Sequence, residues 1–254
     1  MSYRGFDPEK DTPINRKSTR TLSGVSPIAV VLPPRGCAHG TCVYCPTHAN
    51  APQSYTPKSP AIMRAIRLKF DPFQQVKSRL TAFHSMGHPT DKVEIIIMGG
   101  TFLSYPADYQ YNFVKSIYDG LNDTISVDLN ESKLINENSN TNRCVAMCIE
   151  TKPDWSKKKE IKSMLDFGAT RCEIGVQMLD DESYLLTNRG HTIQDVVEAT
   201  QQLKDAGFKV GYHTMPGLPG SSFEKDIEKF EQIFSDQKFR PDQIKIYPCQ
   251  VIQG

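Results

Sequence analysis

Acidic residues are missing from one long part of the sequence, since no Asp or Glu occurs between Thr12 and Phe70. The whole chain of 254 residues is nearly neutral, with 30 Lys and Arg against 29 Asp and Glu. This acid-free segment is therefore strongly basic, and the rest of the chain is net acidic. Such a division of charge is typical of a protein that meets an anionic partner at one end. The basic residues of the segment are Arg16, Lys17, Arg20, Arg35, Lys58, Arg64, Arg67 and Lys69.

Several other features are absent, and each absence excludes a class of protein. No apolar run reaches the roughly 18 residues of a membrane span, so we expect no membrane partner. The first ten residues hold no apolar stretch, so we expect no secretory signal. No sequence repeat occurs, which excludes a solenoid. Seven cysteines in such a chain favour the reducing cytoplasm, where clustered thiols suit metals better than disulfides.

The sequence instead contains apolar, β-branched runs that alternate with helical stretches. This alternation predicts an α/β fold with a parallel sheet and right-handed crossovers. Six such units fit either an open doubly wound sheet or a six-stranded partial barrel. The predicted strands are Ile28–Leu32, Val93–Met98, Cys144–Ile149, Arg171–Val176, Lys209–Tyr212 and Gln243–Tyr247. The predicted helices are Ala61–Met86, Tyr109–Leu121, Trp155–Phe167, Thr192–Ala206 and Phe223–Phe234.

The composition predicts one main domain preceded by an arm. Residues 1–24 are polar and contain two prolines, so we expect a basic N-terminal arm with little core of its own. Residues 25–254 carry all six predicted strands and form the main domain. The stretch Asn122–Asn142 is rich in Asn and Ser, which predicts a surface insertion.

Three cysteines lie close together in the loop that follows the first predicted strand. Cys37, Cys42 and Cys45 fall within nine residues, a spacing that lets thiols converge on a metal. A zinc ion prefers four ligands, and His48 could complete a set of three cysteines and one histidine. An iron–sulfur cluster normally takes four cysteines, so three would leave one iron open to a substrate or cofactor. The loop alone does not decide between these two metals.

The carboxyl ends of the other predicted strands are polar or rich in glycine. In a parallel barrel this edge holds the active site, whereas a structural zinc ribbon has no need of such residues. We therefore favour the partial barrel, with a catalytic cluster in the cysteine loop. The strand-end residues are Met98-Gly-Gly-Thr101, Glu150, Gln177, His213-Thr-Met-Pro-Gly-Leu-Pro-Gly220 and Tyr247-Pro248.

A set of longer motifs runs from about Arg16 to Val251. The motifs are Cys37-x4-Cys-x-Tyr-Cys45-Pro, Gln53-Ser-Tyr-Thr56, Met63-Arg-Ala-Ile-Arg67, Asp71-Pro-Phe73, Gly87-His-Pro-Thr-Asp-Lys-Val93, Ile96-Ile-Met-Gly-Gly-Thr-Phe102, Glu150-Thr-Lys-Pro-Asp-Trp155, Asn188-Arg-Gly-His-Thr192, Val210-Gly-Tyr-His-Thr-Met-Pro-Gly-Leu-Pro-Gly220 and Phe239-Arg-Pro-Asp242. With them the sequence resembles the radical S-adenosylmethionine (SAM) superfamily, and specifically the family of the Elongator catalytic subunit and its archaeal homologues.

The resemblance implies a partial (β/α)6 TIM-like barrel and a set of cofactor contacts. Cys37, Cys42 and Cys45 would be the catalytic, metal-binding residues, because they would hold a [4Fe–4S] cluster whose fourth iron binds SAM. The remaining cofactor contacts would be Tyr44 on the adenine, Gly99, Gly100 and Thr101 on the methionine moiety, Glu150 and Arg189 on its amine and carboxylate, Gln177 on a ribose hydroxyl, His213 and Met215 on the adenine side, and Lys92 on acetyl-CoA.

The implied activity is formation of a 5-carboxymethyl-type uridine at the wobble position of tRNA, with acetyl-CoA as co-substrate. A 5′-deoxyadenosyl radical from SAM would take a hydrogen from the acetyl methyl group, and the resulting carbon radical would add to C5 of the uracil. The partner is therefore tRNA, and a loop base must be splayed out to be reached. The candidate RNA contacts are Arg16, Lys17, Arg20, Arg64, Arg67 and Lys69.

The sequence departs from the family most clearly at its end, where homologues continue into an acetyltransferase domain. We therefore expect a radical SAM core that stops before that domain. Two alternatives remain open. The chain is either a module that binds tRNA and SAM and needs a separate acetyltransferase or another Elongator-like partner, or an RNA-binding protein stapled by zinc.

Overall fold

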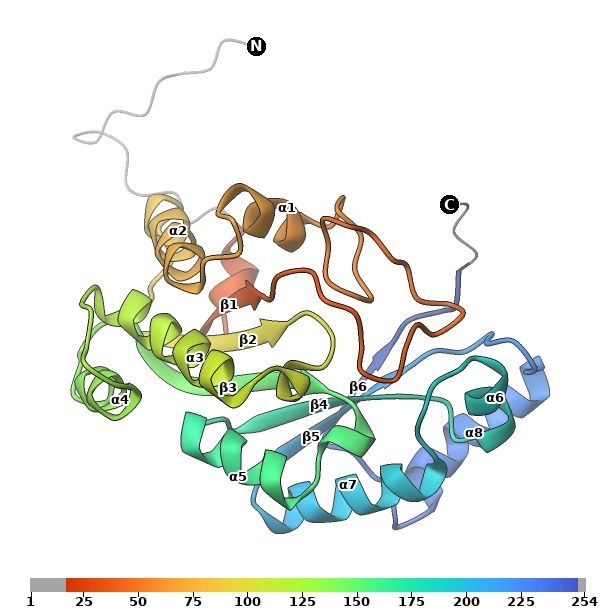
Figure 1. Cartoon of the computed structure of the whole chain (residues 1–254). Coiled ribbons are helices and arrows are strands. Elements are labelled where there is room, and N and C mark those ends of the chain that lie inside the picture. Colours follow the sequence, from red (N-terminus) through yellow and green to blue (C-terminus); the bar gives the residue numbers. More distant parts are fainter. Residues whose placement is uncertain (1–16, 251–254) are drawn as a thin grey trace.

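The computed structural model describes residues 17–250 and contains six parallel strands curled into half of a barrel (Figure 1). Each strand pairs with the next one along the chain, from β1 to β6. This order confirms the predicted partial (β/α)6 barrel, because a doubly wound sheet reverses its strand order at one point. The strands are β1 Ser26–Val31, β2 Lys92–Met98, β3 Arg143–Thr151, β4 Arg171–Gln177, β5 Lys209–Thr214 and β6 Gln243–Ile246.

Most of the helices cover the outer, convex face of the sheet, where right-handed crossovers put them (Figure 1). None of the helices between residues 17 and 250 is both long and apolar enough to cross a membrane. The helices are α1 Pro60–Arg67, α2 Pro72–Ser85, α3 Ala107–Asn122, α4 Leu129–Glu137, α5 Lys158–Phe167, α6 Asp181–Leu186, α7 Ile193–Asp205 and α8 Phe223–Ser235. Three short 3₁₀ helices are η1 Ser18–Thr21, η2 Phe102–Ser104 and η3 Pro153–Trp155.

The predicted helix Ala61–Met86 is wrong, because this stretch forms two helices, α1 and α2. The chain leaves α1 through Lys69 and Phe70, which have left-handed φ values of 52° and 57°. A new helix then begins at Pro72, and the Asp71 carboxylate accepts a hydrogen bond from the backbone N–H of Gln74 at 2.9 Å. Proline suits the first turn of a helix and disfavours helical backbone in the residue before it, so the break lies where the sequence dictates.

The predicted surface insertion Asn122–Asn142 contains a helix that its polar composition hides. Helix α4 packs on α3 and buries one apolar side chain, Leu129, together with the polar Ser132 and Asn136. The buried Asp119 carboxylate of α3 accepts hydrogen bonds from the Ser126 hydroxyl at 2.6 Å and the Ser132 hydroxyl at 2.7 Å. Because buried polar groups are stable when they are hydrogen-bonded, this interface needs few apolar side chains.

The apolar core lies between the convex face of the sheet and the outer helices. Val and Ile side chains of β1 and β2 contribute to it, among them Val30 and Ile95. A smaller apolar cluster lies where α1 packs against β1, around Val31, Ile62 and Ala65. The inner, concave face of the half barrel, which we call the lumen, is instead lined by polar side chains.

The free edge of β1 is closed by a side chain. The Gln75 amide nitrogen donates to the Val31 carbonyl at 2.9 Å, and its oxygen accepts from the Val31 N–H at 2.8 Å. Gln75 is buried on α2, so it takes the place that a neighbouring strand would occupy. Such covering protects an edge strand from pairing with other chains.

Candidate active site

The cysteine loop lies at the carboxyl edge of the sheet and is held by the segment that joins α6 to α7 (Figure 1). The Val43 N–H donates to the Thr187 carbonyl at 3.1 Å, and the Asn188 side chain donates to the Thr41 carbonyl at 3.1 Å. Asn188 has a left-handed φ of 54°. The residues on either side of Cys42 are therefore anchored to a segment almost 150 positions away along the chain.

Cys42 is the buried member of the three cysteines, and its sulfur lies next to one histidine and one arginine. The His39 Nε2 atom lies 3.3 Å from the Cys42 sulfur, and the Arg189 guanidinium lies 3.8 Å from it. Gly190 packs against the His39 ring, and a Cβ atom there would lie 2.9 Å from the His39 Cβ. The Arg-Gly pair of the Asn188-Arg-Gly-His motif therefore shapes the space around this thiol.

The surroundings of the three thiols are positively charged. Burial together with the nearby thiols of Cys45 and Cys42 raises the pKa of the Cys37 thiol, and Arg189 and Lys152 oppose this shift. Lys152 is buried near the same place, and burial and Arg189 both lower the pKa of its ammonium group. Cations beside a thiol stabilise the thiolate, which is the form that binds iron or zinc. The three thiols, with Arg189 and Lys152 close by, therefore suit a metal bound by thiolates, which carries a negative charge.

The ligand atoms of the three cysteines and His48 are not gathered as closely as those of one other group. Among residues 17–250, one group of three potential metal ligands has all its ligand atoms within 4.8 Å of one another, and it is Glu150, Glu173 and His213. The geometry of the thiols alone therefore leaves both the cluster and the zinc interpretation of the cysteine loop open.

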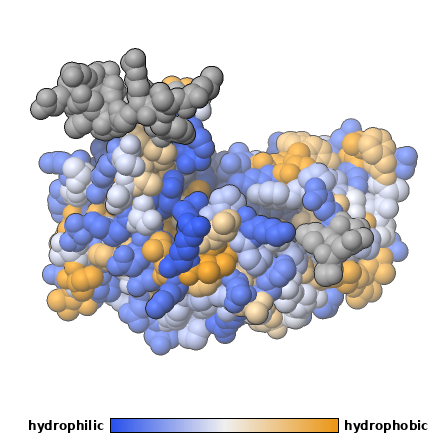
Figure 2. Space-filling model, turned by 90° about the horizontal axis from the view of Figure 1, so that it is seen from above, coloured by the Kyte–Doolittle hydropathy of each residue, from blue (hydrophilic) through white to orange (hydrophobic). Residues whose placement is uncertain are grey.

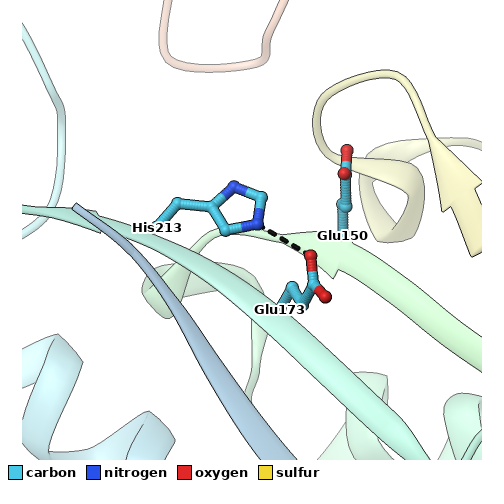
Figure 3. Close-up of side chains that lie close together, drawn as sticks. All are labelled: Glu150, Glu173 and His213. Atoms are coloured by element: carbon cyan, nitrogen blue, oxygen red, sulfur yellow. Dashed lines mark hydrogen bonds and ion pairs between the residues drawn. The ribbon is translucent and has the colours of Figure 1, made fainter. Parts of the chain in front are cut away.

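Glu150 at the end of β3 faces the space below the cysteine loop (Figure 3). Its carboxylate accepts a hydrogen bond from the Tyr55 hydroxyl at 2.7 Å. Burial raises the pKa of the Glu150 carboxyl, and the nearby Glu173 charge acts in the same direction. The carboxylate is therefore poised to gain from a cationic ligand, such as an amine, that enters the lumen.

Glu173 of β4 is the centre of a charge network in the lumen (Figure 3). Its carboxylate contacts the His213 Nε2 atom at 2.7 Å, the Lys245 ammonium, and the Arg171 guanidinium at 3.4 Å. Arg171 also pairs with Glu94 at 2.7 Å. Although burial alone would raise the pKa of Glu173, the hydrogen bonds from His213 and Lys245 outweigh it and lower the pKa to about 2.

This network was missed by the sequence prediction, although a signal was present. Charged residues such as Glu173 and Lys245 stand inside strands that are otherwise apolar. The close group of Glu150, Glu173 and His213 has the composition of a metal site, but Arg171 and Lys245 already supply Glu173 with cations. We therefore interpret it as an ion-pair network of the lumen.

Several buried polar atoms in and around the cysteine loop have no hydrogen-bond partner within the described part of the chain. They are the His39 Nδ1 atom, the Tyr44 hydroxyl, the Gln177 side-chain oxygen, the Arg189 Nε atom and both ring nitrogens of His191. Gln177 ends β4 with a left-handed φ of 69°, and its carbonyl accepts from the Met215 N–H at 2.7 Å. Buried polar groups are nearly always satisfied in native proteins, so unpaired atoms in one place indicate a polar ligand.

The glycine pair after β2 has two different structural roles. Gly99 packs so closely on β1 that an added Cβ would lie 2.8 Å from the Leu32 Cβ, so packing alone explains this glycine. Gly100 has a φ of 88° but open space beside it, with the nearest atom to a Cβ at 3.8 Å. Thr101 is buried next to them. Contact of Gly99, Gly100 and Thr101 with the methionine moiety stays a prediction, and the space beside Gly100 is compatible with it.

Lys92 lies apart from the other predicted site residues. It begins β2, pairs with Arg143 at the start of β3, and is exposed. The amino ends of the strands lie opposite the cysteine loop, so Lys92 is at the other end of the barrel from Glu150.

Of the predicted RNA contacts, Arg16 lies outside the described residues. The others are Lys17 and Arg20 at η1, Arg64 and Arg67 on α1, and Lys69 just after α1.

A comparison with known proteins agrees with this geometry. Residues 31–232 match the radical SAM superfamily. The chain belongs to the radical SAM superfamily. Membership of this superfamily implies a [4Fe–4S] cluster and SAM as cofactors, and the thiols and unpaired polar atoms described above fit both.

Solved radical SAM structures share the half barrel. The archaeal Methanocaldococcus infernus Elp3 with an N-terminal deletion superposes with a TM-score of 0.76 at 43% identity, covering 91% of this chain and 47% of that one. Coproporphyrinogen III oxidase from Escherichia coli, a radical SAM enzyme, superposes with a TM-score of 0.54 at 14% identity, covering 89% of this chain and 44% of that one. The second likeness concerns the fold alone.

Relatives in sequence cover almost the whole of this radical SAM chain. It is 54% identical over 239 residues to the tRNA uridine(34) acetyltransferase of Dehalococcoides mccartyi, covering 94% of this chain and 52% of that protein. It is 41% identical over 251 residues to Elongator complex protein 3 of Homo sapiens, covering 95% of this chain and 46% of that protein. The chain spans about half the length of the curated relatives that it matches.

Proposed function

We propose that this radical SAM chain modifies the wobble uridine of tRNA with a [4Fe–4S] cluster held by Cys37, Cys42 and Cys45. The observation that carries the proposal is the cysteine loop, which is anchored by Asn188 and bordered by the Arg189 guanidinium. The names of the relatives, tRNA uridine(34) acetyltransferase and Elongator complex protein 3, support the choice of substrate. All seven cysteines are free thiols, which fits a reducing compartment such as the cytoplasm.

We propose that the residues around the loop bind SAM. When bound, the cluster and SAM would supply reductive cleavage of the sulfonium to a 5′-deoxyadenosyl radical. Glu150 would accept the amine of the methionine moiety, because its carboxylate is buried beside a single neutral donor, Tyr55. Arg189 would hold the carboxylate through its unpaired Nε atom, and Gln177 a ribose hydroxyl through its unpaired oxygen.

The remaining SAM contacts in this proposal come from the neighbouring strand ends. Tyr44 would lie against the adenine, with its unpaired hydroxyl available to a polar atom of SAM. The other contacts would be Gly99, Gly100 and Thr101 along the methionine moiety and His213 and Met215 on the adenine side. Exclusion of water from the loop keeps the radical from side reactions, and the buried Cys42 and Arg189 contribute to that exclusion.

The acetyl group of the proposed 5-carboxymethyl product would come from acetyl-CoA. A second candidate function is a module that binds tRNA and SAM while a separate acetyltransferase or other Elongator-like protein supplies the acyl group. One observation favours this second candidate: Lys92 lies at the end of the barrel opposite the cysteine loop.

The first experiment tests the cluster and SAM. Anaerobic reconstitution with iron and sulfide should give a brown protein with about four iron atoms per chain. With dithionite and SAM it should release 5′-deoxyadenosine, measured by chromatography. Cys42→Ser should lose both the colour and the product, whereas Cys144→Ser, which changes a thiol outside the loop, should keep them. A colourless protein that binds one zinc ion would contradict the proposal.

The second experiment separates the two candidate functions. The reconstituted chain is incubated with tRNA, SAM and acetyl-CoA, and the tRNA nucleosides are analysed by mass spectrometry. A complete enzyme gives 5-carboxymethyl-type uridine from the chain alone. A partial module gives 5′-deoxyadenosine but no modified uridine until an acetyltransferase protein is added.

A further inference from the structure

Two arginines from neighbouring helices line one small cavity beside β1. Arg64 comes from α1 and Arg79 from α2, and Ala29, Gln75 and Ser78 complete much of the wall. The cavity has a volume of about 10 Å³, close to the space of a single water molecule. Figure 2 views the face on which α1 and α2 lie, and hydrophilic side chains gather over its middle.

Neither arginine has an anionic partner in the part of the chain that the structure describes. No carboxylate there lies within ion-pair distance of Arg64 or Arg79, and neither guanidinium donates a hydrogen bond to a protein acceptor. Arg79 is fixed in place because it stacks on the Phe83 ring, 4.6 Å from its centroid. The oxygen of the nearby Gln75 side chain is already used by the backbone of β1. Between residues 17 and 250, the N–H donors of both guanidinium groups therefore have no acceptor.

The placement of these cations is costly in the free protein. Burial lowers the pKa of Arg64, and the charge of Arg20 on η1 lowers it further. Burial also lowers the pKa of Arg79, and Arg64 and Arg20 add to the effect. Three positive charges thus repel one another at one place, and an anion bound between them would remove that repulsion.

We propose that Arg64 and Arg79, with Arg20 beside them, bind one backbone phosphate group of the RNA substrate. This inference rests on the proposed function and names a place where the RNA would be held. Arginine forks match the oxygen atoms of a phosphate, and each guanidinium can donate two parallel hydrogen bonds. The cavity itself has room for about one water molecule, so the phosphate would lie across the two half-exposed guanidinium groups and not inside the cavity. Such a site contacts the backbone without reading the sequence.

The surroundings favour a polyanion over a small free phosphate compound. The site is open to solvent at the Arg20 side, where that side chain is exposed. Arg67 and Lys69 extend the positive surface along the end of α1. Because a single small anion would leave these charges unused, the row of cations suits a chain of phosphates.

The test measures the affinity of the full chain for a labelled tRNA by fluorescence anisotropy at several NaCl concentrations. Arg64→Gln should weaken binding about fivefold at 0.1 M salt and should lower the slope of log affinity against log salt by about one, as expected for one lost phosphate contact. Lys77→Gln is the matched control, because Lys77 lies on α2 but pairs with Asp123 at 2.7 Å. It should leave both the affinity and the slope near those of the wild type.

Two further measurements ask whether Arg64 supports the fold and whether the anion is a small one. Thermal unfolding of Arg64→Gln should occur at or above the wild-type temperature, because the substitution removes repulsion; marked destabilisation would show that Arg64 is structural and would overturn the inference. Titration with inorganic diphosphate distinguishes the source of the anion. Arg64-dependent diphosphate binding together with unchanged tRNA affinity in Arg64→Gln would also overturn it, in favour of a small-anion site.

The outcomes for the inference and for the proposed function are separable. If the wild type binds tRNA and the variant binds it equally well, the phosphate site is wrong and the proposed function stands. If the wild type itself does not bind tRNA, the proposed substrate is wrong and the inference falls with it.

Discussion

The lumen and the α1–α2 surface use positive charge in opposite ways. In the lumen, Arg171 and Lys245 both contact the Glu173 carboxylate, which is 1% exposed. On the α1–α2 surface, Arg64 and Arg79 have no carboxylate partner among the described residues. The cations of the lumen are neutralised by a carboxylate of the same chain. In our proposal, Arg64 and Arg79 are neutralised only when a phosphate binds.

The difference has a physical consequence for stability and for binding. Removing one partner of a buried ion pair leaves an uncompensated charge and is strongly destabilising. Removing a half-exposed cation that has only repulsive neighbours costs little. Charges of the lumen are therefore expected to support the fold, and charges of α1 and α2 to support binding.

The largest effect is expected for Glu173→Gln. The substitution leaves Lys245 and Arg171 without their shared carboxylate, and the expected loss of unfolding free energy is about 3–5 kcal/mol. Urea denaturation followed by circular dichroism measures it. Asp166→Gln is the control, because the Lys162–Asp166 pair is exposed on α5 and such pairs contribute at most about 1 kcal/mol. Equal losses for both variants would contradict the expectation that the buried ion pairs of the lumen support the fold more than an exposed pair does.

The second prediction concerns acid. The Glu173 pKa falls from its ordinary 4.5 to about 2 on folding, so its contribution is fully present above about pH 4.5 and is lost as the pH falls towards 2. Burial raises the pKa of Glu150, which therefore acts in the opposite direction. The difference in unfolding free energy between wild type and Glu173→Gln isolates the contribution of the Glu173 charge, including its effect on the pKa of Glu150. That difference should be constant from pH 7 to 5 and shrink from pH 4.5 downwards; a constant difference down to pH 3 would contradict the assignment.

The smallest effect is expected in the cysteine loop, which is anchored by neutral hydrogen bonds. Asn188→Ala removes the bond to Thr41 and places a less tolerant residue at a φ of 54°, with an expected loss of about 1–2 kcal/mol. Iron content after reconstitution should fall about twofold, since the loop is less well ordered. Asn188→Gly tolerates the left-handed backbone conformation but lacks the hydrogen bond to Thr41. It therefore separates the effect of the lost hydrogen bond from the effect of backbone strain. Unchanged iron content in both variants would mean that this anchor does not position the loop.

Much of the fold could be predicted because its signals are local. The strands are apolar and β-branched, and β2 begins one residue before the predicted Val93–Met98 and ends at the predicted residue. The break between α1 and α2 was also encoded locally, in the Asp71-Pro72 pair, and was overlooked because apolar periodicity runs through it. The cysteine triplet and the strand ends located the candidate site, because parallel strands bring their carboxyl ends to one edge.

The rest depends on contacts between distant segments. The pairing of Glu173 with Lys245 requires the register of β4, β5 and β6, which no local pattern specifies. The same holds for Arg64 and Arg79, whose proximity follows from how α1 and α2 lie on β1. Helix α4 was missed because its contacts with Asp119 are polar, so it has no strong apolar face to recognise.

The Gln75 amide makes the two edges of the sheet different in their ability to pair with a further strand. At β1 the backbone groups of Val31 that face outward are already taken by this side chain, so a further strand could not pair with Val31 without displacing Gln75. At the other margin β6 pairs with β5 alone among the described strands, and Ile246 is 53% exposed. An incoming strand would therefore meet less competition beyond β6. It would widen the barrel mouth on the side of Lys245 and leave the β1 side, with its arginine cavity, unchanged.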